Sequence, residues 1–288
     1  GATLNVYEYA AREGTLTRIL EVGRLLGWSA DSYTDGKIHG HMGVTPDGLL
    51  WGVTHEGVHP TPAWHAAGFR GSWLFSYDLK TREARNWGVP FPGHSLPCST
   101  LDEKRGRYVV ATSSGAILTW DCNDKRVRHA GYPPNGWTWW ARSLFCDRST
   151  GLFWGMDSSE EPHHFMSYDP ELNRFQRYDT VVPAHPTTGK AAMLRGHTPD
   201  PAQDGFVYWA TGNGTLFRFK PNGTNAPLAE TVGTTWEQGR DTLQIAMDPT
   251  GRYLYYFPKG DSPIVQFDVK TGRKKALCWL QDFYFEKY

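Results

Sequence analysis

The stretch DRSTGLFWGM at residues 147–156, followed by FMSYDPELNRFQRY at residues 165–178, decides the fold. The first segment is an Asp-to-Gly turn that leads directly into an aliphatic and aromatic strand. The second segment is a strand that ends in Tyr168 and Asp169, then a tight turn, then a more polar strand. With one strand before the turn, this makes four short antiparallel strands, which is the blade of a β-propeller.

The same two segments occur five times along the chain. The turn with its strand recurs as TPDGLLWGVT (45–54), DEKRGRYVVAT (102–112), PAQDGFVYWAT (201–211) and DPTGRYLYYF (248–257). The second segment recurs as LFSYDLKTREARNW (74–87), ILTWDCNDKRVRHA (117–130), LFRFKPNGTNAPLA (216–229) and IVQFDVKTGRKKAL (264–277). Its aromatic residues are Tyr77, Trp120, Tyr168, Phe219 and Phe267, which lie 43, 48, 51 and 48 residues apart. A period of this length is typical of propellers.

Five blades are expected from the repeats, at about residues 40–88, 95–131, 141–178, 191–232 and 241–280. The segment at residues 4–22 resembles the outer two strands of a further blade, and residues 281–288 resemble the start of an inner strand. We therefore expect an all-β, seven-bladed β-propeller over residues 1–288, a single domain truncated at its C-terminus. A six-bladed ring is the alternative.

Composition excludes several classes of protein. Thirty Lys and Arg balance thirty Asp and Glu, so no net charge draws the chain to nucleic acid or to an anionic membrane. No apolar run approaches the roughly 18 residues of a membrane-spanning helix. The four cysteines form no CxxC pair, which argues against a thiolate zinc site. The motifs of serine-elbow hydrolases, P-loop enzymes and HExxH zinc proteases are absent from the sequence.

Two glycosylation sequons begin at Asn213 and Asn222, both in Gly-containing turns. A glycan carried on such turns would point outward. Together with the lack of a cytosolic redox motif, the sequons predict a secreted glycoprotein.

Candidate functional residues fall where propellers place their sites, in the loops at one mouth of the central channel. Five of the eleven histidines lie within 27 residues, at positions 39, 41, 55, 59 and 65. The loops of later blades add His94, Arg142, Arg195, His197 and Arg240. Polar side chains also line the water-filled channel of any propeller, so it is the convergence of these residue types that indicates a site.

The residue types at this mouth suit a sugar acid. Arginine grips a carboxylate through two parallel hydrogen bonds, and an indole face stacks on a pyranose ring. Trp137, Trp139 and Trp140 break the blade repeat and are the expected stacking platform. Trp51, Trp154 and Trp209 belong to repeated strands and are expected in the core. The predicted partner is an acidic glycan that contains uronic acid. The predicted substrate-binding residues are His39, His59, His94, Trp137, Trp139, Arg195, His197 and Arg240.

The segment KIHGHMGVTPDGLLWGVTHEG at residues 37–57, the blade repeat and the Arg-bearing strands resemble the secreted β-propeller polysaccharide lyases. This family includes the ulvan lyases and the rhamnosyl-glucuronate lyases. The resemblance implies that His39 or His41 takes the place of a first catalytic histidine and His55 or His59 that of a second. It further implies Arg142 or Arg195 at the substrate carboxylate and Tyr132 as the catalytic tyrosine, although the Tyr-to-Arg spacing departs from the family's.

Such lyases cleave by β-elimination at a uronic acid. A base removes the C5 proton, and a cation neutralises the carboxylate and stabilises the enolate-like intermediate. An imidazole suits proton transfer near neutral pH, and His41 and His55 are the expected pair. Arg142 or Arg195 would supply the cation, and Ca²⁺ in the central channel is the alternative. The expected activity is that of a polysaccharide lyase.

Two other functions fit the same sequence. A non-catalytic propeller that binds carbohydrate, as lectins do, or that binds a protein would use the same tryptophans and arginines. A glycosidase would need two carboxylates across the scissile bond, and Asp35, Asp157, Glu160, Glu161 and Asp241 are available. A lyase, unlike a lectin, needs at least one histidine placed to move a proton.

Overall fold

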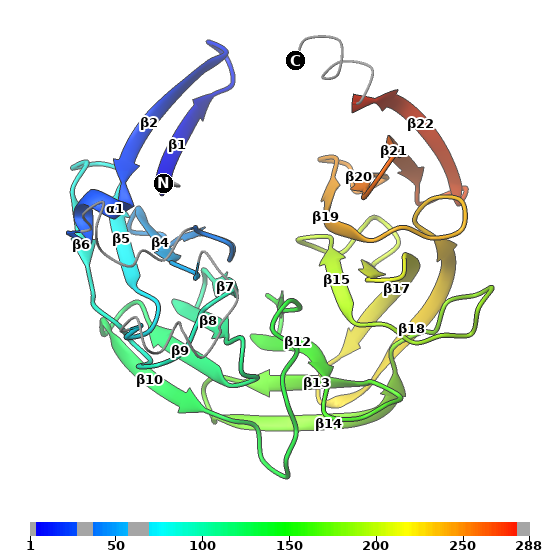
Figure 1. The fold of residues 1–288 in the computed structure, drawn as a ribbon, viewed down its shortest axis with the longest axis horizontal. Coiled ribbons are helices and arrows are strands. Elements are labelled where there is room, and N and C mark those ends of the chain that lie inside the picture. Colours follow the sequence, from blue (N-terminus) through cyan, green and yellow to red (C-terminus); the bar gives the residue numbers. More distant parts are fainter. Residues whose placement is uncertain (1–3, 28–36, 57–68, 281–288) are drawn as a thin grey trace. The chain divides into compact units, whose positions relative to one another are not determined.

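Antiparallel strands form nearly all of the regular structure, and one short helix interrupts them in the described part of the chain. The computed structural model describes residues 4–27, 37–56 and 69–280. The chain divides into two compact units, Gly1–Pro133 and Pro134–Tyr288, which are described separately. Figure 1 follows the strands of both units along the chain.

The first unit contains a hairpin and two four-stranded sheets. The hairpin is β1 (Asn5–Ala10) with β2 (Thr15–Glu21), and the helix α1 (Val22–Leu25) follows it. The first blade consists of β3 (Gly43–Val44), β4 (Leu49–Val53), β5 (Leu74–Asp78) and β6 (Ala84–Asn86). The second blade consists of β7 (Cys98–Asp102), β8 (Arg107–Ala111), β9 (Ile117–Asp121) and β10 (Arg126–Gly131).

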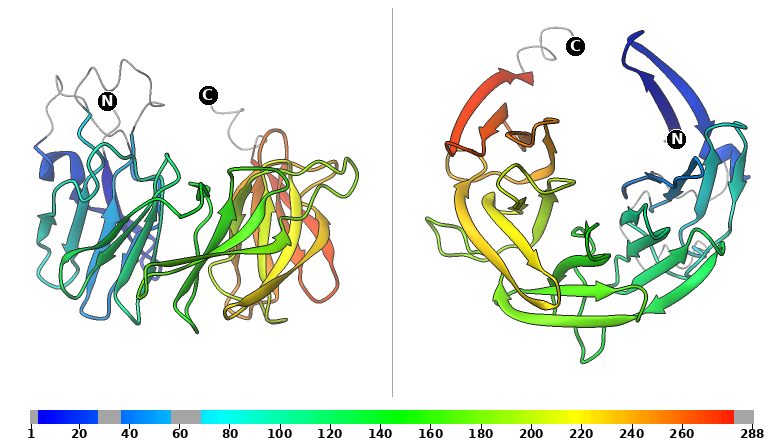
Figure 2. Two further views of the ribbon diagram at one scale, coloured as in Figure 1. Left: turned by 90° about the horizontal axis from the view of Figure 1, so that it is seen from below. Right: turned by 180° about the vertical axis from the view of Figure 1, so that it is seen from behind.

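The second unit contains three four-stranded sheets, which Figure 2 shows from two further sides. The third blade is β11 (Phe145–Asp147), β12 (Leu152–Asp157), β13 (His164–Asp169) and β14 (Arg174–Val181). The fourth is β15 (Leu194–His197), β16 (Val207–Thr211), β17 (Thr215–Asn222) and β18 (Asn225–Thr234). The fifth is β19 (Thr242–Met247), β20 (Tyr253–Pro258), β21 (Pro263–Asp268) and β22 (Arg273–Trp279).

The fold is an all-β β-propeller with five blades of four antiparallel strands, as the repeats predicted. In every blade the strands pair in the order in which they follow along the chain. The segment at residues 4–22 forms the two-stranded sheet β1–β2, which agrees with the expectation of an incomplete blade there. Residues 281–288, expected to begin an inner strand, lie outside the described residues.

The repeated turn residues have local physical roles. The repeat glycines Gly48, Gly106, Gly151, Gly205 and Gly251 have φ angles of 92°, 65°, 80°, 79° and 71°, a backbone conformation that other residues adopt only with strain. The aspartate that ends the third strand accepts backbone N–H groups of the next turn, as Asp169 does from Glu171 and Leu172. Lys220 takes this position in the fourth blade, where β17 and β18 continue to a turn at Gly223.

The core lies between neighbouring sheets within each unit. In the first unit, Val6 and Leu20 of the hairpin pack with Leu50 and Phe75 of the first blade. A second cluster joins the first two blades, and two more join the third blade to the fourth and the fourth to the fifth. Trp51, Trp154 and Trp209 are fully buried, which confirms that they are core residues.

Candidate functional site

The histidine-rich segment of the first unit meets the end of strand β4 in an isolated antiparallel bridge. Lys37 and His55 exchange both backbone hydrogen bonds, with N–O distances of 3.3 and 2.8 Å. Residues directly opposite each other in an antiparallel pair project their side chains to the same face. Lys37 and His55 therefore share one face, and Ile38 between Lys37 and His39 packs against the core cluster of the hairpin.

His55 is buried and its ring orientation is fixed. Its Nδ1 lies 2.7 Å from Oε2 of Glu56 and 2.7 Å from Oγ of Ser95, a residue of the following blade. An ionised carboxylate only accepts hydrogen bonds, so pairing with Glu56 selects the tautomer with the proton on Nδ1. In this tautomer Nε2 is the ring nitrogen that carries a lone pair. This carboxylate–histidine pair is the arrangement that orients a general base.

Glu56 is as buried as His55, with 4% of its surface exposed. A buried carboxylate is costly unless it is hydrogen-bonded, and Glu56 accepts bonds from His55 and, at 3.4 Å, from the hydroxyl of Ser113. Sequence reasoning did not include Glu56 or Ser95 in the site. The position of Glu56 directly after His55 was the available signal, whereas Ser95 is 40 residues away and left none.

His39 is the histidine that lies against His55. The two ring centroids are 5.3 Å apart and the planes are inclined by 76°, an edge-to-face contact. Nδ1 of His39 lies 2.8 Å from the carbonyl oxygen of Pro97 and donates to it, so that its Nε2 is the remaining polar atom of the ring. We use the name histidine site for the group made up of Lys37, His39, His55, Glu56 and Ser95.

His41, one of the expected pair, is exposed, and its backbone is bonded to the next blade. Its N–H donates to the carbonyl of Ser99, and its carbonyl accepts from the hydroxyls of Ser99 and Tyr108. Burial raises the pKa of Tyr108 far above its usual value, so this hydroxyl stays a donor. The structure thus places His39, the alternative first histidine, in ring contact with His55. His59 and Asp35 lie outside the described residues.

His94 and Tyr132 form a second small group in the first unit. The ring of His94 stacks on Phe91 at 3.9 Å and its Nδ1 lies 2.8 Å from the hydroxyl of Ser114. Burial lowers the pKa of His94. The Tyr132 ring, 58% exposed, meets it edge-on at 6.0 Å. The predicted catalytic tyrosine is therefore paired with a predicted substrate-binding histidine.

In the second unit, Arg195 is already engaged with a carboxylate of the chain. Its guanidinium makes two hydrogen bonds to Asp241, at 2.9 and 2.8 Å, and Lys259 approaches the same carboxylate at 2.6 Å. Burial opposes the charge of Asp241, but the hydrogen bonds from Arg195 and Lys259 lower its pKa below the usual value. Arg240 is exposed beside this cluster, and a Cβ added at Gly260 would lie 3.1 Å from its Nη1. The bidentate grip expected for a substrate is thus made within the protein by Arg195.

The predicted tryptophan platform needs a correction at Trp139. This side chain is 1% exposed, its indole N–H donates to the carbonyl of Ser143, and its ring fills the space beside Gly155. It is a core residue and presents no face to a sugar. Trp137, Trp140 and Arg142 are half-buried, and the indole N–H of Trp140 donates to the carbonyl of Leu194.

His197 also packs against the core. Its ring lies 4.6 Å from that of Trp209 and 5.7 Å from that of Phe145, and its Nδ1 donates to the carbonyl of Thr198.

The carboxylates considered for a glycosidase form ion pairs with arginines of the chain. Asp157 and Glu160 both bind Arg177, and Asp241 binds Arg195.

The two glycosylation sequons differ in their surroundings. The amide nitrogen of Asn213 donates to the carbonyl of Lys190, and its amide oxygen accepts from Thr211 and Thr215, both of which are fully buried. A glycan on Asn213 would replace one hydrogen of this half-buried amide nitrogen next to the carbonyl of Lys190, and glycosylation at this position stays a prediction. Asn222 is exposed at the tip of the β17–β18 hairpin.

No group of three or more His, Cys, Asp or Glu side chains that could hold a metal ion occurs in residues 4–27, 37–56 and 69–280. Ca²⁺ in the central channel stays a prediction. The structure shows no disulfide bond at any of the four cysteines. Within the described part of the chain, no helix has the length and apolar character needed to cross a membrane.

Comparison with known proteins supports the fold alone. No protein-family model matches the chain, and no curated protein matches its sequence. Among solved structures, 1303 chains match it, which makes the fold a common one and says little about function. One is a chain of the crystal structure of a nidogen/laminin complex, with a TM-score of 0.55 and 11% sequence identity over 95% of this chain and 89% of that one.

Proposed function

We propose that this propeller is a polysaccharide lyase that cleaves a glycosidic bond at a uronic acid by β-elimination, with a rhamnosyl-glucuronate linkage as the expected substrate. One observation carries the proposal: the Glu56 carboxylate and Ser95 bind Nδ1 of His55, while the ring of His39 lies against the ring of His55. Two histidines in contact, one of them oriented by a buried carboxylate, fit a proton transfer better than they fit carbohydrate binding alone.

In the proposed reaction, Nε2 of His55 removes the C5 proton of the uronate. The electron pair of the C5–H bond forms the C4–C5 double bond, and the C4–O4 bond breaks. His39, when protonated, gives a proton to the departing O4 oxygen. Each step conserves atoms, and the protein regains its starting state when His55 passes its proton to solvent and His39 takes one up.

The uronate carboxylate needs a cation while negative charge develops at C5. Lys37 supports this part of the proposal, because it shares the face of His55 and its side chain is exposed. Arg142, Arg195 and Tyr132, which the family resemblance implied for the reaction, stay predictions. The Asp241 carboxylate already engages Arg195, so a substrate would have to compete for it.

The experiment is a spectrophotometric assay on uronate-containing glycans, because elimination produces an unsaturated uronate that absorbs in the ultraviolet. We expect His55→Gln to lower kcat by about 10²- to 10⁴-fold. The control variant is His164→Gln in the second unit, where the ring bonds to the carbonyl of Tyr178 and kcat should not change. Retained glycan binding without any rise in absorbance would favour the alternative, a carbohydrate-binding or protein-interaction propeller.

The proposal includes an extracellular location and a seven-bladed ring. The exposed sequon at Asn222 supports the first. The β1–β2 sheet packs on the first blade through Val6 and Leu20 as a neighbouring blade would, which supports a sixth blade, and the seventh stays a prediction. Electron microscopy of the protein would count the blades directly.

A further inference from the structure

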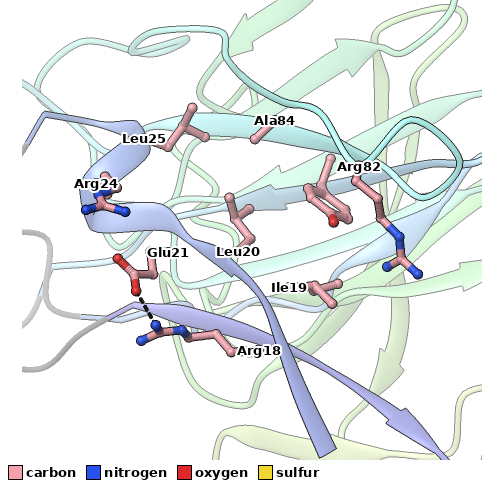
Figure 3. Close-up of a pocket in the computed structure, with 9 residues that line it drawn as sticks. Arg18, Ile19, Leu20, Glu21, Arg24, Leu25, Arg82 and Ala84 are labelled. Carbon is pink, nitrogen blue, oxygen red and sulfur yellow. Dashed lines mark ion pairs between the residues drawn. The ribbon is translucent and has the colours of Figure 1, made fainter.

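A groove lies between the N-terminal hairpin and the first blade, within the first unit and apart from the histidine site. Strand β2 and helix α1 form one wall, and β5, β6 and the turn between them form the other. Its volume is about 380 Å³, at the lower end of the roughly 300 to 1,000 Å³ typical of ligand pockets. Figure 3 shows the side chains that line it.

The floor of the groove is aliphatic and its rim is basic. In Figure 3 the side chains of Leu20 and Leu25 lie between Arg24 at one end and Arg82 at the other, with Arg18 on the near side. The lining contains one aromatic residue, Tyr77, which is only 3% exposed. The groove therefore offers no ring face on which a sugar could stack, and its floor suits a branched aliphatic side chain.

Of the three arginines that line the groove, two form ion pairs with carboxylates of the chain. Arg18 pairs with Glu21 and Arg82 pairs with Glu8, and the side chains of both arginines are about half exposed. Arg24 is exposed and has no ion-pair partner among the residues that the structure describes. Exposed ion pairs contribute little, so a ligand carboxylate can compete for Arg18 and Arg82 as well as bind Arg24.

We infer that this groove binds an acidic peptide segment in which an aliphatic side chain stands next to a carboxylate. The aliphatic side chain enters the floor at Leu20 and Leu25, and the carboxylate pairs with Arg24. An acidic peptide with an aliphatic side chain matches both the charge and the apolar surface of the groove. A neutral peptide would leave Arg24 without a carboxylate, and an inorganic anion would leave the aliphatic floor uncovered.

The test is fluorescence anisotropy of the full chain with a labelled peptide of alternating Leu and Asp. Two comparison peptides replace every Asp with Asn or every Leu with Gly. Binding of the Leu–Asp peptide should exceed that of both. Arg24→Ala should weaken it by about fivefold, the effect expected of one exposed ion pair, and added salt should reduce the difference.

Arg12→Ala is the matched control, because Arg12 is an exposed arginine of the same hairpin that does not line the groove. It removes the same charge and should leave the affinity unchanged. Equal weakening by Arg12→Ala, or equal binding of the Asp and Asn peptides, would overturn the inference. Thermal melting of both variants shows whether each still folds, and Arg24→Lys, which keeps the charge, should recover part of the affinity.

Discussion

The ring of His39 meets the ring of His55 edge-on, with centroids 5.3 Å apart. His39 comes from the segment that leads into the first blade, and His55 follows the second strand of that blade. The contact depends on the bridge between Lys37 and His55, which sets the register of the two segments. Two imidazole rings are thus held in contact by backbone pairing.

Replacing Glu56 tests whether its carboxylate orients His55. In Glu56→Gln the amide keeps the shape of the side chain but can also donate to Nδ1, which favours the wrong tautomer. We expect kcat to fall by about 10²-fold or more while KM changes little, measured by the absorbance assay. Glu103→Gln, a change at a half-buried residue of the second blade's first turn, is the control. Unchanged turnover in Glu56→Gln would mean that this carboxylate has only a structural role.

Gly155 leaves the space that the indole of Trp139 occupies. A Cβ at this position would lie 2.5 Å from Cζ2 of Trp139 and 2.9 Å from the carbonyl oxygen of Ser143. Gly155→Ala should lower the free energy of unfolding by about 1–3 kcal/mol, measured by denaturant titration. Gly212→Ala is the matched control in the same unit, since the nearest atom to its Cβ would be 3.8 Å away.

Asp241 should make stability depend on pH in the acid range. Because its pKa is lowered in the folded state, its contribution is complete above the ordinary value of 3.8 and is lost as pH falls through the folded value. Asp241→Asn should cost about 1–2 kcal/mol at pH 7, where it leaves Arg195 and Lys259 without their carboxylate. Melting curves of both proteins should converge as the pH drops below that range. A difference that stays constant down to the lowest pH would contradict the assignment.

Glycan occupancy should differ between the two sequons. Expression through a eukaryotic secretory pathway should add a glycan at Asn222, which is exposed, and none at Asn213, whose amide nitrogen is bonded to Lys190. Intact-mass measurement of Asn222→Gln and Asn213→Gln checks this directly. Loss of glycan mass in the Asn213 variant alone would show that glycosylation precedes formation of this network.

The blades could be predicted from the sequence because their signals are local and periodic. A glycine at positive φ, such as Gly151, and a buried aromatic, such as Tyr168, return once per blade with their spacing intact. Trp139 was mistaken for a surface residue because it breaks this repeat. Its burial depends on the missing side chain of Gly155, 16 residues away, which no periodic pattern reports.

The candidate site was only partly predictable. His55 was selected from sequence, but the choice between His39 and His41 depends on register against the end of β4, and these residues are only two positions apart. The hydrogen bonds between Arg195 and Asp241 likewise join residues that are 46 positions apart in the sequence. Such long-range pairings decide which side chains remain available to a ligand, and a single sequence does not contain them.

Each blade uses four strands that are consecutive in the chain and pair in that order. A sheet can therefore form as soon as its own segment has left the ribosome, without waiting for residues from a later blade. Most strand pairing is closed by short turns, which keeps the entropy cost of each step low. Assembly during synthesis would then proceed as a series of hairpin additions, with each new blade covering the apolar face of the one made before it within its unit.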